Sequence, residues 1–310
     1  MIKDNGIEIF TSKELMPSER AIRQLGKIAL DERIRKPVLG LVDIHDKKGN
    51  DFPTGVVAAS ATHIFPQLMV SGPNCGMCMI TTPILRDSFE ENDVDNLYDH
   101  FSKEIHISSF LGERLSGEDI VEVIMSGASW VGKMYPDSKV DVKNIELQGN
   151  AFSGIDIDEG IIREAIPESI INLSRHRMGI LRKGNHFLEL QVVEKIFDES
   201  IAESFSIREN GLCFLLHSGS GGFGAIVSHL YSPKTFASRE IKMHAFIIAE
   251  WFKSIGKTKR RRYIKKMYSH ALKKGAPLFG LEEGSDLADI YLTAIMASSN
   301  FAYANRFLLP

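Results

Sequence analysis

The sequence is poor in cysteine, in long apolar runs and in net charge. Three cysteines among 310 residues are too few for a secreted disulfide framework, so we expect a reducing, cytoplasmic compartment with thiols available as ligands. No apolar run approaches the roughly 18 residues that span a bilayer, and the first residues lack the apolar core of a secretion signal, so no membrane partner is expected. A formal charge of −3 gives no overall attraction to nucleic acid, and any basic site must be local.

Repeats, low-complexity tracts and Pro/Gly-rich linkers are also absent, and a chain that is 44% apolar can bury a large core. Glycine-punctuated, β-rich segments lie at residues 33–80, 184–197 and 212–218. Helical periodicity predicts an insertion at about 87–182, an arm at about 236–275 and a last helix at 286–309. We therefore expect the α/β (α+β) class, as a single domain over 1–310 with a mixed β-sheet core and helical insertions.

The first candidate site consists of residues at predicted strand ends. Cys75 stands in SGPNCGMC, His186 in GNHF and His217 in LLHSGS, each beside glycines that let a metal ion or a phosphate approach closely. A thiolate with two imidazoles is a ligand set for a transition metal. A cysteine or histidine at a strand end is more often structural, and sequence alone does not show whether these three residues converge.

Cys75 and Cys78 also form a CxxC motif. It is compatible with a redox pair or with half of a four-thiolate zinc site. Both interpretations are weak, because the chain has no second CxxC and the motif does not open a helix after a first strand. We expect Cys78 to belong to the core.

The loop at residues 219–224 satisfies GxGxxG and follows a predicted strand. This pattern is typical of a dinucleotide-binding turn, and Glu240 stands near the spacing of a ribose-binding acid. Against this interpretation, the helix that follows is short and no clear βαβ unit surrounds the loop. The same glycines suit a cradle of backbone N–H groups for a phosphate, which we favour.

A basic segment, KTKRRRYIKK, covers residues 257–266 on a predicted helix. Its cationic side chains are Lys257, Lys259, Arg260, Arg261, Arg262, Lys265 and Lys266. Such a patch binds an RNA backbone with a strong dependence on salt. The alternative is an ordinary solvated helix face, and both interpretations stay open at this point.

Five segments in collinear order resemble motifs of the RtcB RNA ligases. They are LVDIHDKKGNDFPTG with Asp43, His45, Gly49 and Gly55, then NCGM at 74–77, GNHFLE at 184–189, HSGSGGFG at 217–224 and SNFAYANR with Asn300, Asn305 and Arg306. Five motifs together are far more specific than any one of them. On these residues the chain is identified as a member of the family.

The resemblance implies a GTP- and Mn²⁺-dependent ligase of tRNA splicing and RNA repair, which joins an RNA 3′-phosphate or 2′,3′-cyclic phosphate to a 5′-hydroxyl. It implies that Cys75, His186 and His217 are ligands of one or two Mn²⁺ ions, with the Cys75 thiolate bridging. The implied nucleotide contacts are Asn185, His186, Phe187, Leu188 and Glu189, and the implied RNA or phosphate contacts are Asp43, His45, Ser218, Ser220 and the basic segment.

Three departures from the family pattern bear on activity. Gly72 stands where the family has a carboxylate three residues before the ligand cysteine, and Gly221 replaces the arginine of HSGSRG. The family's nucleophilic histidine follows the ANR element, whereas four residues follow Arg306 here, so no catalytic nucleophile is identified. We expect either the N-terminal portion of a ligase that acts with a C-terminal RtcB portion, or a paralogue that binds metal, nucleotide and RNA without ligation. A dinucleotide-dependent oxidoreductase is the third hypothesis.

Overall fold

The computed structural model describes residues 2–12, 14–46, 51–69, 72–105, 107, 115–136, 142–232, 241–273 and 277–309. Gly49 of the first motif lies outside these residues. Contacts divide the chain into two compact units, one of Met1–Ser71 with Ile226–Ala294 (unit 1) and one of Gly72–Ala225 with Ile295–Pro310 (unit 2). We expected one α/β unit. Of the three internal boundaries, those after Ala225 and Ala294 fall within helices, so no linker composition marks these two.

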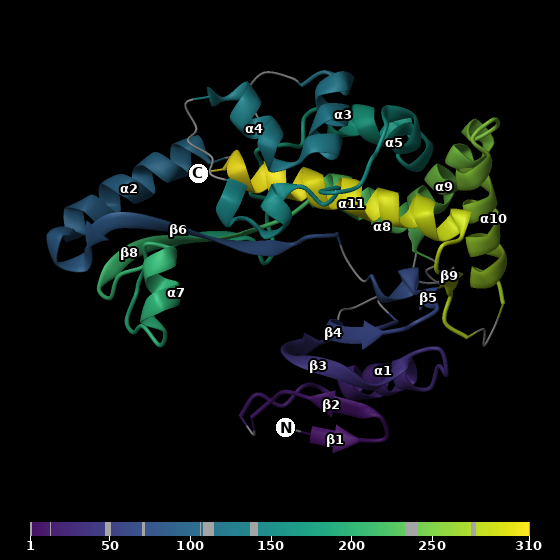
Figure 1. Cartoon of the computed structure of the whole chain (residues 1–310), viewed down its shortest axis with the longest axis horizontal. Helices are drawn as coiled ribbons and strands as arrows, with labels where there is room; N and C mark the ends of the chain where they lie inside the picture. The colour runs from purple at the N-terminus through teal and green to yellow at the C-terminus, as the bar shows by residue number, and fades with distance from the viewer. Residues whose placement is uncertain are drawn as a thin grey trace. The chain divides into compact units, whose positions relative to one another are not determined.

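Unit 1 contains two small sheets and a set of helices (Figure 1). Its strands are β1 (Ile2–Asp4), β2 (Ile7–Ile9), β3 (Arg35–His45), β4 (Thr54–Ala59), β5 (His63–Ile64) and β9 (Leu281–Glu282). Its helices are α1 (Glu19–Ala29), the 3-10 turn η1 (Pro66–Leu68), α9 (Ile241–Lys253) and α10 (Thr258–Ala271). One sheet has the order β1-β2-β3-β4, and β5 pairs with β9 in the other.

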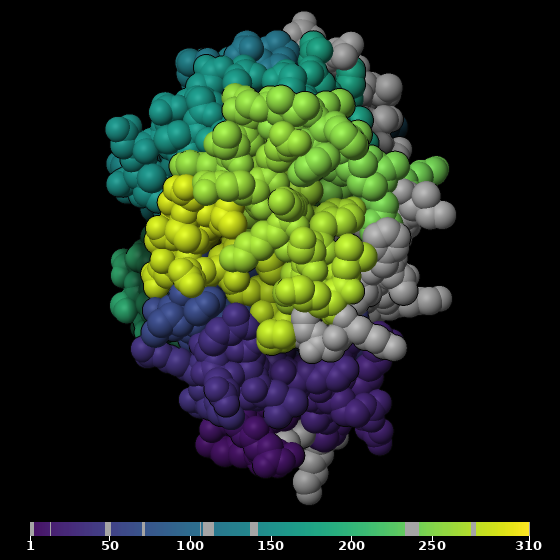
Figure 2. Space-filling model, turned by 90° about the vertical axis from the view of Figure 1, so that its right-hand side faces the viewer, coloured from purple at the N-terminus to yellow at the C-terminus, as the bar shows by residue number. Residues whose placement is uncertain are grey.

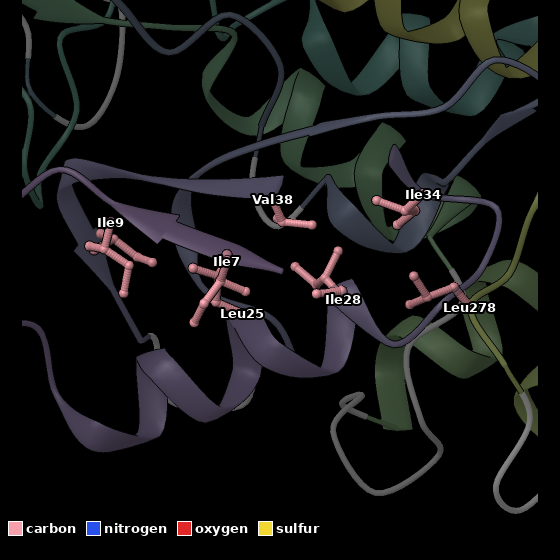
Figure 3. Packing of buried hydrophobic residues seen from close by; sticks show 9 residues of the cluster. Ile7, Ile9, Leu25, Ile28, Ile34, Val38 and Leu278 are labelled. Atoms are coloured by element: carbon pink, nitrogen blue, oxygen red, sulfur yellow. The ribbon is translucent and has the colours of Figure 1, made fainter. Parts of the chain in front are cut away.

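Helix α1 covers the four-stranded sheet. The Ser18 side chain caps its first turn by accepting a hydrogen bond from the Ala21 N–H, which satisfies a backbone donor that the helix leaves unpaired. The helix connects the parallel strands β2 and β3 and directs Leu25 and Ile28 toward Ile7 and Val38 of the sheet (Figure 3). This apolar layer is one hydrophobic core cluster of unit 1.

Unit 2 contains a three-stranded sheet and a helical insertion. Its strands are β6 (Gly76–Leu85), β7 (Phe187–Val192) and β8 (Gly211–Ser218). Its helices and 3-10 turns are η2 (Arg86–Ser88), α2 (Glu91–Glu104), α3 (Gly117–Ser126), α4 (Ala128–Met134), η4 (Val142–Asn144), η5 (Glu146–Gly149), α5 (Glu159–Ala165), α6 (Glu168–Ser174) and α7 (Glu199–Ser204). These elements confirm the predicted α/β class and the helices expected between residues 87 and 182.

The sheet of unit 2 has the order β6-β8-β7, with β8 antiparallel to both neighbours. A dinucleotide-binding turn requires parallel strands on either side of its helix. The loop at 219–224 follows β8 and therefore lacks that setting, so the dinucleotide interpretation is wrong. The GxGxxG pattern was misleading because a glycine-rich turn between a strand and a helix does not indicate whether the neighbouring strands are parallel.

Two further helices, α8 (Gly221–Tyr231) and α11 (Asp286–Phe307), contain the boundaries between the units. Within unit 2 they are joined by Phe223 and Phe301, whose rings stack with centroids 4.7 Å apart. Over the described part of the chain, no helix is both long enough and apolar enough to cross a membrane.

Candidate functional site

One end of the three-stranded sheet of unit 2 brings Cys75, His186 and His217 together. The residues that begin β6 and β7 pair with the last two residues of β8, so the positions just before β6 and β7 meet the end of β8. Cys75 Sγ lies 3.3 Å from His186 Nε2 and 3.4 Å from His217 Nε2. The three ligand atoms all lie within 4.8 Å of one another. The strand register thus produces the convergence that the spacing alone left open.

Neighbouring groups contact both imidazoles, and one of these contacts fixes the tautomer of His186. His186 Nδ1 lies 2.8 Å from the carbonyl oxygen of Leu181, and because a carbonyl only accepts, Nδ1 carries the proton and Nε2 has a lone pair. The Asn185 amide nitrogen lies 3.1 Å from His217 Nε2, the same atom that faces Cys75, so this contact and a bound ion would compete for one lone pair. The Leu181 contact uses the ring nitrogen of His186 that faces away from Cys75, and outer contacts of that kind set the tautomer of metal-binding histidines.

The residues of the cluster fit a transition-metal ion. Sulfur and nitrogen ligands of one tetrahedral ion lie about 3.6 Å apart, given bond lengths of about 2.3 Å and about 2.1 Å, so a small outward shift of Cys75 accommodates an ion. Cys75 is exposed, which gives a ligand access from solvent. Three protein ligands leave a coordination position for a substrate.

Partial burial favours the neutral form of His217. Burial lowers the pKa of this imidazole, and the nearby His186 lowers it further. A neutral imidazole is the form that binds a metal. His217 is therefore suited to ligation near neutral pH.

Asn305 and Arg306, at the end of α11, hold the segments that carry the cluster. Arg306 donates to the carbonyl oxygens of Asn74 at 2.7 Å and of Ser218 at 3.0 Å, and to Asn74 Oδ1 at 3.0 Å. Asn305 Oδ1 accepts the Gly179 N–H at 2.9 Å. We predicted the ANR element as a motif without a role, and its role is to position the loop before Cys75 against the end of β8.

The glycine-rich loop after His217 packs tightly on the Cys75 turn. A Cβ on Gly219 would lie 2.9 Å from Cys75 Cα, so only glycine allows this approach. Ser218 and Ser220 are buried, and their hydroxyls bond inside unit 2, Ser218 accepting from Asn305 Nδ2 and Ser220 donating to the Pro73 carbonyl. We expected these two hydroxyls to contact phosphate. In the structure both are buried and form hydrogen bonds within unit 2 instead.

The family model described as tRNA-splicing ligase RtcB matches residues 24–310. The chain belongs to the RtcB family. It is 27% identical over 300 residues to the tRNA-splicing ligase RtcB of Thermococcus kodakarensis, which covers 94% of this chain and 54% of that protein. The RtcB protein of Nanoarchaeum equitans is 25% identical over 314 residues, covering 98% and 57%, and that of Archaeoglobus fulgidus is 29% identical over 226 residues, covering 69% and 44%.

The chain spans about half the length of the curated RtcB relatives that it matches. At Gly72, where we expected a departure from the family pattern, a Cβ would lie 3.1 Å from Ser220 Oγ. Among the described residues, the group of metal-ligand candidates at this site contains no carboxylate. Its donors are one thiol and two imidazoles.

The predicted nucleotide contacts of this RtcB protein lie beside the cluster. Asn185 bonds His217, and the Phe187 ring lies 5.6 Å from the His217 ring. Leu188 and Glu189 continue along β7, and the exposed Glu189 carboxylate accepts from Gln191 at 2.9 Å. The segment therefore offers one amide and one carboxylate to a ligand.

The remaining predicted contacts lie in unit 1. Asp43 and His45 are exposed near the end of β3, where the Asp43 carbonyl accepts from His45 Nδ1 at 2.6 Å. In α10, Arg260 is only 4% exposed and bonds Ser254, so it is part of the interior. This corrects the expectation that Arg260 contacts RNA.

The other cations of the basic segment have varied surroundings. Lys259 and Arg262 lie near Asp286 at 3.7 and 2.7 Å, and Arg261 stacks on Trp251. Within the basic segment, three exposed lysines form no ion pair with any residue that the structure describes. They are Lys257, Lys265 and Lys266. Helices α9 and α10 are open to solvent on the face in Figure 2.

Proposed function

We propose that this chain binds Mn²⁺ at Cys75, His186 and His217 and acts on GTP and RNA ends in RtcB-type ligation. The reaction would join an RNA 3′-phosphate to a 5′-hydroxyl. A 2′,3′-cyclic phosphate would first be hydrolysed to the 3′-phosphate. The observation that carries the proposal is the convergence of a thiol and two imidazole lone pairs at one sheet end. Membership of the RtcB family supports an RNA substrate, since the relatives are named tRNA-splicing ligases.

The protein groups around the cluster have distinct tasks in this proposal. Cys75, His186 and His217 would hold the ion, which when bound would supply positive charge to polarise a phosphate. The Leu181 carbonyl keeps the proton of His186 on Nδ1, so that Nε2 stays available. The Asn185 amide, which contacts His217 Nε2, would turn to the nucleotide when the ion takes that lone pair, and the exposed Glu189 would accept hydrogen bonds from the N–H groups of guanine.

The overall reaction balances with GTP as a substrate. GMP is transferred to the RNA 3′-phosphate and pyrophosphate is released. The 5′-hydroxyl oxygen then attacks the activated phosphorus, loses its proton and displaces GMP, which leaves a phosphodiester. By resemblance to the family, the histidine that first accepts GMP would come from a C-terminal RtcB portion.

A second candidate is a paralogue that binds metal, nucleotide and RNA without ligation. It is favoured by the ligand group itself, in which the described residues provide no carboxylate. Mn²⁺ prefers oxygen ligands, whereas a thiolate with imidazoles also suits zinc. Such a protein would retain binding while lacking one anionic ligand for the catalytic ion.

A joining assay separates the two candidates. The purified chain is incubated with Mn²⁺, α-labelled GTP and RNAs that carry 3′-phosphate and 5′-hydroxyl ends, with and without the C-terminal half of the Thermococcus kodakarensis relative. Joined RNA, with label on protein, is expected in the complemented reaction, and it should disappear with Cys75→Ala but persist with Cys78→Ala. Binding of GTP and RNA without joining in either reaction supports the paralogue. No binding of either ligand refutes both proposals.

A further inference from the structure

A basic pocket lies in unit 2 beside the first residues of α8. It has a volume of about 530 Å³ and its lining includes Arg177, Arg182, Lys183 and Gly222. Arg177 is half-buried, and Arg182 and Lys183 are exposed, so the pocket is open to a ligand from solvent. A volume of several hundred cubic ångströms accommodates a nucleotide-sized molecule.

Among the residues that the structure describes, no carboxylate pairs with the cations of this pocket. Over the described parts of the chain, neither arginine nor Lys183 forms an ion pair. In contrast, Arg163 in the same unit forms ion pairs with three glutamates. Although Arg182 reaches solvent, desolvation of the inner part of its side chain and the charge of Arg177 both lower the pKa of its guanidinium. Two neighbouring guanidiniums without a counter-ion make an environment that an anion stabilises.

The glycines at the start of α8 place both arginines against the helix. A Cβ on Gly222 would collide with the Arg177 guanidinium, and one on Gly221 would lie 3.1 Å from Arg182 Cδ. The first backbone N–H groups of a helix point outward and carry partial positive charge. The helix terminus therefore adds to the charge of the two side chains, and the fork of each guanidinium matches phosphate oxygens.

The pocket shares two chain segments with the metal-ligand cluster. Arg182 and Lys183 directly precede the segment Gly184–Asn185–His186, and Gly222 belongs to the loop that follows His217. Apolar side chains, Ile107 and Leu173, line the same pocket and are 50% and 46% exposed. Cationic and apolar groups together suit a ligand with a phosphate and a flat apolar part, as a nucleotide has.

We propose that the Arg177–Arg182–Lys183 pocket is a phosphate-binding site distinct from the Cys75 cluster. The phosphate belongs either to the RNA strand or to the nucleotide, and this assignment of its source rests on the proposed function. The binding of phosphate itself is independent of the proposed function, because the two guanidiniums and the helix terminus attract a phosphate without a metal.

Binding measurements without added metal test the site. The probes are inorganic phosphate, GTP, and an RNA oligonucleotide with either a 3′-phosphate or a 3′-hydroxyl. Arg177→Gln and Arg182→Gln should each weaken binding of the phosphate-bearing probes about tenfold, since each removes a charge-assisted hydrogen bond. Arg182→Lys should restore part of the loss, and the exposed Arg208→Gln is the matched control. Removal of a repelling charge should leave the unfolding midpoint unchanged or raised.

The probes also identify the source of the phosphate. A loss for GTP alone assigns the site to the nucleotide, and a loss for both RNAs assigns it to the strand backbone. A loss restricted to the 3′-phosphorylated RNA assigns it to the strand end. Unchanged affinity for all probes in folded Arg177→Gln and Arg182→Gln proteins overturns the site. Mn²⁺ affinity, measured separately, should stay unchanged in both variants and fall with Cys75→Ala, so failure of this site and failure of the proposed function are distinguishable.

Discussion

In unit 2, residues up to 142 positions apart place a thiol and two imidazoles within 4.8 Å of one another. In unit 1, the seven cations of residues 257–266 are consecutive or nearly so, and they point to different surroundings around α10. Strand pairing brings together residues that are far apart in the sequence. The start of one antiparallel strand lies beside the end of its neighbour, at the same end of the sheet. Helical periodicity separates residues that the sequence groups, because successive side chains differ by about 100° around the axis.

The largest effect should follow removal of the thiol from the gathered cluster. Cys75→Ala deletes the atom that both imidazoles face, and we expect Mn²⁺ affinity to fall at least about 100-fold, or about 2.7 kcal/mol. Isothermal titration calorimetry measures this change. Cys78→Ala, three residues later and within β6, is the matched control and should keep the affinity. Equal affinities for both variants would remove Cys75 from the ligand set.

Loss of the Arg306 side chain should loosen the same cluster. Arg306→Met keeps the volume but leaves the Asn74 and Ser218 carbonyls without this donor, so unfolding free energy should fall by about 3 kcal/mol. In the variant that remains folded, Mn²⁺ affinity should fall about tenfold. Denaturant unfolding and calorimetry measure the two effects, with Arg208→Met as control. A loss of stability with full metal affinity would show that Arg306 does not position the ligands.

The dispersed cations of α10 should have a smaller effect. Replacing Lys257, Lys265 and Lys266 with glutamine should weaken RNA binding several-fold and reduce the slope of log affinity against log salt by about two, at about 0.7 per phosphate contact on a single strand. Filter binding at several salt concentrations measures both. Arg260→Gln should leave the slope unchanged, because Arg260 is buried. An unchanged slope in the triple variant would identify this helix face as merely solvated.

The smallest effect should appear in the pH dependence of stability. Burial lowers the pKa of His270 in α10, and its Nε2 donates to the Pro277 carbonyl at 2.8 Å, so the neutral ring suits the fold. In the unfolded chain this group has a pKa near 6.5 and binds a proton more readily. Stability should therefore decline as pH falls below about 6.5. Thermal unfolding between pH 7 and pH 5 should show a weaker decline for His270→Gln, and identical profiles would exclude this contribution.

The sequence singled out the residues of the candidate metal cluster but not their geometry. Cys75, His186 and His217 were recognisable from residue type, strand ends and flanking glycines. Their convergence depends on the pairing of β6 and β7 with β8, which is a property of register between distant segments. The direction of β8 was equally hidden, so the GxGxxG loop admitted a dinucleotide interpretation that antiparallel pairing excludes.

Other features depended on contacts that no local pattern expresses. In the sequence, nothing distinguishes Arg177 and Arg182 from other basic residues. Their role in a pocket depends on the start of α8, which lies beside them in the fold. Burial of Arg260 was predictable in principle, because Arg260, Tyr263, Ile264 and Met267 follow the i, i+3, i+4, i+7 spacing of a buried stripe. The high positive charge of residues 257–266 suggested an RNA contact for Arg260 more strongly than this spacing suggested its burial.

The bonds of Arg306 also have a consequence for the order of events during synthesis. His217 and Ser218 leave the ribosome before α11, and Arg306 follows Ser218 by 88 positions. Because a chain emerges at about 5–20 residues per second, a newly made cluster waits several seconds for the side chain that joins its two loops. During that interval the thiol and imidazoles belong to a nascent chain without this brace, so under the proposed function stable binding of metal is expected only after α11 has been made.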